Sequence, residues 1–125
     1  MTENEISYKI KGAIFKVYNE LGLGLFESVY EAALLYQLKK DGLEVKAQVD
    51  IPVFYDEQLL NVGFRLDILV EDKVIIEIKS VQKLEKVHHK QITNYLKLTK
   101  LKLGILVNFN TDNILENTIR KVNNL

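Results

Sequence analysis

The sequence predicts a single-domain α/β sandwich, in which a central mixed sheet is flanked by helices and the element order is ααβββαβα. The length of 125 residues is that of one domain, and 47% hydrophobic residues are enough for a core. Apolar residues recur at helical spacing in four stretches, and they alternate or run continuously in four others. No linker, repeat or low-complexity segment divides the chain, so we expect one domain over residues 1–125.

Two helices open the chain. The first is predicted over 5–21, where apolar residues at three- and four-residue spacing are Ile6, Ile10, Ala13, Ile14, Val17 and Leu21. Gly22 and Gly24 end it, because glycine readily adopts the left-handed conformation that closes a helix. The second helix is predicted over 27–40, and its inward residues are Val29, Tyr30, Ala33, Leu34 and Leu38.

Three strands follow, and they should form an antiparallel meander. Residues 45–53 alternate between apolar and polar side chains, and Pro52 places this strand near an edge of the sheet. Turns around 56–58 and 71–73 lead into strands over 59–70 and 74–79.

The remaining elements complete the sandwich. A third helix is predicted over 85–99, and a nearly continuous apolar strand, of the type buried on both faces, over 101–107. Because this strand arrives through a helical crossover, it should pair in parallel. A closing helix is predicted over 114–122.

Composition excludes several classes of protein. The chain has no cysteine, which rules out disulfides, cysteine-ligated zinc and thiol nucleophiles. Its acidic start is followed by no apolar stretch, unlike a secretory signal, and no run approaches the roughly 18 apolar residues of a membrane span. We therefore expect a soluble, cytoplasmic protein without a membrane partner.

The neutral total charge hides an uneven distribution. Residues 1–78 hold 8 basic and 14 acidic side chains, whereas residues 79–102 hold seven lysines and one glutamate. The lysines are Lys79, Lys83, Lys86, Lys90, Lys97, Lys100 and Lys102. This asymmetry predicts a surface that meets a polyanion, although a solvated lysine-rich helix face would give the same composition.

Two carboxylates interrupt strands that otherwise read as buried. Asp67 lies within Leu66–Val70, and Glu77 within Ile75–Ile78. Burying an ionised carboxylate is costly unless it is paired or binds a metal. Glu77 and Lys79 are two residues apart and share one face of their strand, and the turn between the strands brings Asp67 near them.

Two interpretations of this group are open. The Glu-x-Lys spacing occurs three times in the chain, but only Glu77–Lys79 interrupts a hydrophobic strand. The group could be a buried ion pair without chemistry, although such pairs contribute little to stability. Alternatively, two carboxylates and a strand carbonyl suit Mg²⁺ or Mn²⁺, and a nearby lysine could orient an attacking water. These are the parts of metal-assisted phosphodiester hydrolysis.

With these residues, the sequence resembles the PD-(D/E)xK nuclease superfamily. Its first acid falls on Asp67, its second on Glu77 and its lysine on Lys79, while Leu66 stands where the usual proline would be. The resemblance implies a restriction-endonuclease-like fold and a Mg²⁺-dependent (or Mn²⁺-dependent) nuclease. It also implies that Asp67, Glu77 and the Ile78 carbonyl bind the metal.

Further motifs narrow the resemblance to the GxxExxY proteins. Gly24-Leu-Phe-Glu27-Ser-Val-Tyr30 looks like their signature, and Glu27 would bind the metal directly or through water. Gln91-Ile-Thr-Asn-Tyr95 is similar to the Gln-x-x-x-Tyr motif of recombination exonucleases, which implies substrate contact. Leu106-Val-Asn-Phe109 resembles the closing strand segment. Alternatively, Glu27 serves the helix dipole, Gln91 lies on the surface and Tyr95 packs in the core.

The implied substrate is nucleic acid, with DNA favoured over RNA and little sequence specificity. Backbone contacts would come from Lys83, Lys86, Lys90 and Lys97. A chain with one site would have to form a homodimer to cut both strands of a duplex. The rival interpretations are a non-catalytic nucleic-acid-binding or interaction module that kept the fold, and a small hydrolase acting on nucleotides.

Overall fold

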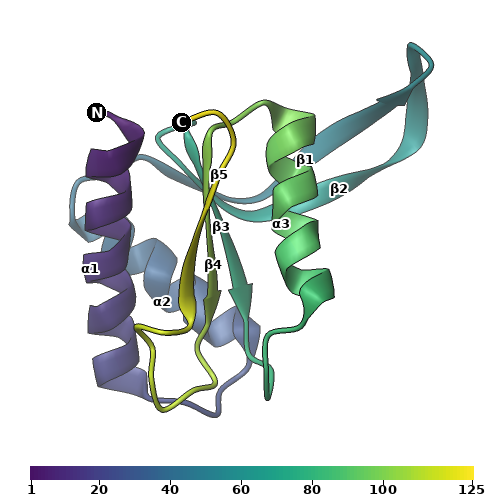
Figure 1. Ribbon diagram of the computed structural model, residues 1–125. Coiled ribbons are helices and arrows are strands. Elements are labelled where there is room, and N and C mark those ends of the chain that lie inside the picture. The colour runs from purple at the N-terminus through teal and green to yellow at the C-terminus, as the bar shows by residue number, and fades with distance from the viewer.

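A five-stranded mixed sheet lies between helices in the computed structural model, which describes residues 1–125 (Figure 1). The helices are α1 Glu3–Leu21, α2 Glu27–Lys40 and α3 Lys86–Thr99. The strands are β1 Val45–Tyr55, β2 Gln58–Val70, β3 Val74–Lys79, β4 Leu103–Asn108 and β5 Thr118–Val122. Helices α1 and α2 cover one face of the sheet, and α3 covers the other. No helix combines the length and apolar character that crossing a membrane requires.

The strand order is β1-β2-β3-β4-β5, which confirms most of the predicted topology. β1, β2 and β3 form the antiparallel meander, and β4 joins β3 in parallel after the α3 crossover. β1 is an edge strand, as Pro52 indicated. Every residue of β4 is buried, as its continuous apolar sequence predicted.

The predicted closing helix over 114–122 is wrong. Residues 118–122 form β5, which pairs antiparallel with β4 from Leu103↔Val122 to Val107↔Thr118. Nine residues give a helix little intrinsic stability, and the β-branched residues of this segment favour a strand. β5 also pairs with backbone groups of β4 that would otherwise lie unpaired at a sheet edge.

Helix α1 begins two residues earlier than predicted because Thr2 and Glu5 form a capping box. The Glu5 backbone N–H donates to Thr2 Oγ1 at 3.2 Å, and the Thr2 N–H donates to Glu5 Oε1 at 2.9 Å. Two of the N–H groups that a helix start leaves without partners are thereby satisfied.

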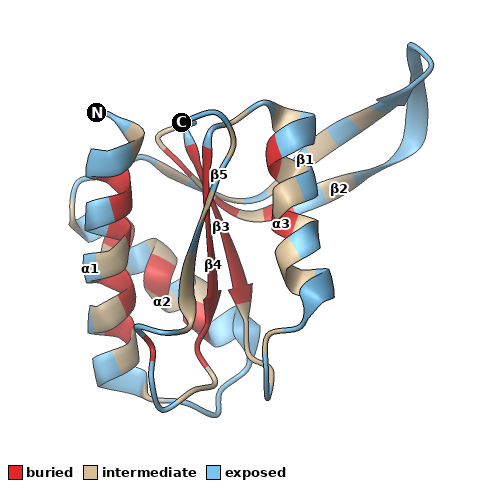
Figure 2. Ribbon diagram, viewed as in Figure 1, coloured by how far each residue is buried: buried red, intermediate tan, exposed pale blue.

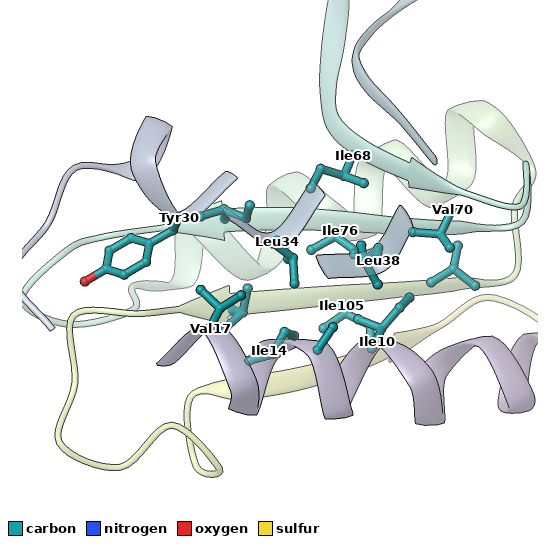
Figure 3. Close-up of a cluster of buried hydrophobic side chains, with 14 of the residues drawn as sticks. Ile10, Ile14, Val17, Tyr30, Leu34, Leu38, Ile68, Val70, Ile76 and Ile105 are labelled. Atoms are coloured by element: carbon teal, nitrogen blue, oxygen red, sulfur yellow. The ribbon is translucent and has the colours of Figure 1, made fainter. Parts of the chain in front are cut away.

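The main core lies between the sheet and the helices α1 and α2 (Figures 2 and 3). Apolar side chains from α1, α2, β2, β3 and β4 meet there, and Figure 3 shows Ile14, Leu34 and Ile105 among them. The aromatic rings of Tyr30 and Phe109 stack at the end of this core, with centroids 4.4 Å apart. Tyr30 is a core residue, as its position in α2 predicted.

A smaller cluster on the opposite face shows that β2 changes the direction of its side chains. Leu66 packs with Ile75 and Leu96 beneath α3, whereas Ile68 belongs to the main core. Residues two apart in a regular strand share one face, so the alternation is interrupted at Asp67. On β1, Gln48 has a left-handed φ of 53° opposite this point, and no Gln48–Asp67 pair forms in the register.

Beyond this interruption, β1 and β2 continue as a two-stranded arm, defined here as residues 49–66 (Figure 1). The register shifts between Pro52 and Phe54, and Asp56 and Glu57 turn the chain at the tip in left-handed conformations. Figure 2 shows that the outer part of the arm is exposed.

Truncating a side chain of the main core should destabilise the fold. Leu34 is completely buried between the sheet and α1, whereas Tyr36 on the same helix is 67% exposed. We expect Leu34→Ala to lower the free energy of unfolding by about 2–5 kcal/mol, because it leaves a cavity. Tyr36→Ala should change it by about 0.5 kcal/mol or less. Urea denaturation measures both, and equal losses would contradict this assignment of the core.

Candidate active site

Strands β2 and β3 separate at Asp67 and Glu77, and side chains replace the backbone ladder there. The last register pair is Ile68↔Ile76. Beyond it, the Asp67 N–H donates to Glu77 Oε1 at 3.3 Å, and the Ile78 N–H donates to Asp67 Oδ2 at 2.8 Å. We call Asp67, Glu77 and Ile78 the strand fork. It brings together the two carboxylates that the sequence predicted would meet.

The two carboxyl groups of the strand fork lie close enough to share a proton. Glu77 is 3% exposed, and burial is the largest of the effects that together raise its pKa from 4.5 to about 9. The negative charge of Asp67 contributes to this increase in pKa, while Lys79 opposes it. The protonated form of Glu77 is therefore favoured, because burial penalises its charged form and the charge of the half-buried Asp67 repels it.

Strand β3 also places Lys79 and the Ile78 carbonyl beside the two carboxyl groups. Ile75 packs beneath α3, so Glu77 and Lys79, at alternate positions, face the same side. The ion pairs of the structure involve other residues, namely Lys16–Asp41, Lys46–Asp72 and Arg65–Asp50. The Ile78 N–H points to Asp67, so the carbonyl of the same residue also faces the strand fork.

Helix α2 places two acids beside the strand fork, of which the sequence predicted one. A cavity of about 220 Å³ is lined by Glu27, Ser28, Glu31, Gln48, Asp67 and Ile78. Glu27 is exposed, and its Oε2 accepts a hydrogen bond from the Ser80 N–H at 3.2 Å. Glu27 thus connects α2 to the residue that follows Lys79.

Glu31 is the residue that sequence reasoning missed. Its Oε1 accepts a hydrogen bond from Gln48 Nε2 at 2.6 Å, so α2 contacts the left-handed residue of β1. Burial raises the pKa of Glu31, although the hydrogen bond from Gln48 lowers it. The charges of Asp67 and Glu27 add to the increase. The available signal was the four-residue spacing from Glu27, which places both acids on one helix face.

Helix α3 brings Tyr95 to the other side of the strand fork. Its ring stacks on Phe64 with centroids 4.3 Å apart. Burial raises the pKa of Tyr95, the charge of Glu77 raises it further, and a hydrogen bond with Gln91 lowers it. Tyr95 is therefore half-buried against the arm and close to Glu77, and Gln91 contacts it.

The four lysines predicted to contact substrate lie outside this group. Lys86, Lys90 and Lys97 are on α3, and Lys83 is in the segment before it. All four are exposed, and none forms an ion pair with an acid of the strand fork.

The donors of the strand fork fit a hard divalent cation. Two carboxylates and a main-chain carbonyl are oxygen ligands, and Mg²⁺ keeps several waters when it binds through one or two carboxylates. No three acidic or histidine side chains converge into a complete cage, so water or substrate would have to supply the remaining ligands. A cation in place of the shared proton would allow both carboxyl groups to ionise.

Comparisons with known proteins agree with this fold. The sequence profile of the PD-(D/E)XK nuclease superfamily matches residues 4–122. The crystal structure of a protein named SSO0001 aligns with a TM-score of 0.59 and 25% sequence identity, over 79% of this chain and 51% of that one. This chain thus spans about half the length of that protein. No curated protein matches significantly. The fold is the restriction-endonuclease-like fold that the motifs implied.

Neutralising Glu77 should stabilise the protein in the absence of metal. Because the pKa of Glu77 is higher when folded, the folded state binds more protons, and stability should fall as pH rises from about 4.5 towards 9. Glu77→Gln cannot ionise and keeps an acceptor for the Asp67 N–H. We expect it to raise the free energy of unfolding at pH 8 by about 1–3 kcal/mol.

Urea denaturation from pH 4 to 9 in a chelator, with the exposed Glu20→Gln as control, measures this effect. If Glu77→Gln is less stable than the wild type at pH 8, the surroundings of Glu77 do not penalise its charged form, and the prediction fails.

Proposed function

Because the chain belongs to the PD-(D/E)XK nuclease superfamily, we propose that it is a divalent-metal-dependent nuclease that hydrolyses phosphodiester bonds of nucleic acid, with DNA the favoured substrate. The observation that carries the proposal is the meeting of the Asp67 and Glu77 carboxyl groups where β2 and β3 separate. Lys79, on the same strand face as Glu77, supplies the third part of the motif.

In this proposal, Asp67, Glu77 and the Ile78 carbonyl hold Mg²⁺ or Mn²⁺, and Glu27 contacts the ion directly or through water. The ion, when bound, offsets the charge that develops on the phosphate and lowers the pKa of its water. Glu27 has one oxygen engaged with Ser80, which leaves the other for such a contact.

Lys79 orients the attacking water and the scissile phosphate. Its ammonium group forms no ion pair with Asp67 or Glu77, so its hydrogen-bond donors are available to substrate. A lysine here holds the water oxygen in line with the leaving oxygen, and its charge compensates the phosphate during attack.

Substrate binding is assigned to α3 and the segment before it. Lys83, Lys86, Lys90 and Lys97 would contact the backbone without reading sequence. Gln91 and Tyr95 lie nearer the strand fork, where Tyr95 approaches Glu77, and would contact the substrate close to the cleaved bond. Cutting both strands of a duplex would take a homodimer.

Within the superfamily, we place the chain among the GxxExxY proteins. Tyr30 supports this, because its hydroxyl donates to the Gly22 carbonyl at 2.6 Å and accepts from the Leu25 N–H at 3.2 Å. Gly24 has a φ of 96°, a conformation that favours glycine. The residues of the signature thus shape the loop that presents Glu27.

Replacing Lys79 should abolish cleavage without unfolding the protein. We expect Lys79→Ala and Glu77→Ala each to reduce the rate of nucleic-acid cleavage by about 100-fold or more, because each removes a group that acts on the attacking water or its metal. Lys40→Ala, at an exposed end of α2, is the control. Cleavage is measured on single-stranded, duplex and branched DNA and RNA, and on free nucleotides.

Persistent cleavage in both variants would refute the assigned site. A preference for free nucleotides would favour the hydrolase that acts on nucleotides.

A metal titration distinguishes a nuclease from a non-catalytic module with the same fold. The module is the alternative that the absence of a complete acidic cage would favour. We expect Mn²⁺ and Mg²⁺ to raise the melting temperature of the wild type, because a ligand that binds only the folded state stabilises it. Glu77→Gln should respond much less, since it loses one anionic ligand. Equal shifts in both proteins would place the cation elsewhere, and no shift in either would favour the module.

A further inference from the structure

The two residues that follow Lys79 are fixed to the body of the protein on both sides. On the α2 side, the Ser80 N–H donates to Glu27 Oε2 at 3.2 Å, and Ser80 Oγ donates to the Leu25 carbonyl at 2.6 Å. The chain leaving β3 is therefore attached to the loop that precedes α2.

On the β4 side, the side-chain amide of Asn108 makes two hydrogen bonds to the main chain of Val81, and its Oδ1 also accepts from the Asn110 N–H at 3.3 Å. Its Oδ1 accepts from the Val81 N–H at 3.0 Å, and its Nδ2 donates to the Val81 carbonyl at 2.9 Å. Asn108 is 1% exposed and is the only polar side chain in β4, where each other residue is apolar or glycine. Burying an amide is costly unless its hydrogen bonds are satisfied, and main-chain groups satisfy both ends of this one.

The register connects this amide to Lys79. Asn108 is the residue paired with Lys79 in the parallel β3–β4 ladder. The next residue, Phe109, donates its N–H to the Lys79 carbonyl at 3.0 Å, and its ring stacks on Tyr30 in the core. The Phe109 N–H thus holds the backbone of Lys79. The backbone of the next two residues is held through the side chains of Ser80 and Asn108.

We propose that Asn108 and Ser80 are positioning residues that fix the end of β3, so that the Lys79 side chain stays beside Glu77 during the reaction. This inference rests on the proposed function, because it assigns the two residues a role through Lys79. Neither side chain needs to touch substrate or metal. Lys79 is the last residue of its strand, and without these bonds the Phe109 N–H alone would hold its backbone against movement of the following segment.

Asn108→Leu tests the proposal, because it keeps the size of the side chain and removes both hydrogen bonds to Val81, together with the one from the Asn110 N–H. We expect kcat to fall by about 10- to 100-fold, the usual cost of a small displacement of a catalytic group. KM should change by less than about threefold, because the binding surface is untouched. Asn123→Leu is the matched control, since the Asn123 side chain likewise bonds to the main chain, by donating to the carbonyls of Leu96 and Leu101, far from Lys79.

Amide hydrogen exchange on the metal-free variants tests the geometry independently of cleavage. The Val81 amide should exchange about tenfold faster in Asn108→Leu, the equivalent of one lost hydrogen bond. The Ile78 amide, which is bonded to Asp67, should keep its wild-type rate. If the wild type cleaves nothing, the proposed function fails, whereas the exchange rates still decide whether Asn108 fixes this segment.

Ser80→Ala serves as a second variant if Asn108→Leu does not fold, because it removes only the bond to Leu25. It should also lower kcat with little change in KM. A folded Asn108→Leu variant with kcat within about twofold of wild type would overturn the proposal. Faster exchange at Ile78 and Val81 alike would also overturn it, since Asn108 would then be a residue of general stability.

Discussion

The placement of two carboxyl groups where β2 leaves β3 is the constraint on which the rest of the structure depends. The Asp67 and Ile78 N–H groups lose their strand partners there, and the Asp67 and Glu77 side chains replace them. The same side chains are thus structural acceptors and reactive oxygens. Their mutual repulsion in a buried place is a local instability that the surrounding core has to offset, as is common at functional sites.

Most elements of the fold follow from hydrophobic periodicity, because each buries a face with a clear repeat. The helix predicted over 114–122 shows the limit of this signal. Apolar residues 115, 119 and 122 fit a helical face, yet Thr118–Val122 joins the free edge of β4. The deciding factor is the need of β4 for a second hydrogen-bonded neighbour, which is a tertiary effect that local spacing does not contain.

The same distinction separates the site residues that could be predicted from those that could not. Asp67 and Glu77 stood out because a charge inside an apolar strand has a high cost and so calls for an explanation. Glu31 did not stand out, since charged residues are ordinary on a helix, and its hydrogen bond to the left-handed Gln48 is a tertiary contact that the sequence does not show. Asn108 lies in a recognisable strand segment, but its partner Val81 is 27 positions away in the sequence.

The arm, residues 49–66, also bears on the geometry of the strand fork. Its base adjoins Gln48 and Asp67, so one of the two acids lies directly next to the arm. From there outward, β2 pairs only with β1 and rests on α3 through Phe64 and Leu66. Any rotation of the arm about its base therefore alters the separation of the two carboxyl groups. A load on the exposed tip would then be transmitted along β2 to Asp67, and in the proposed site it would change the size of the ion that the two carboxyl groups could hold.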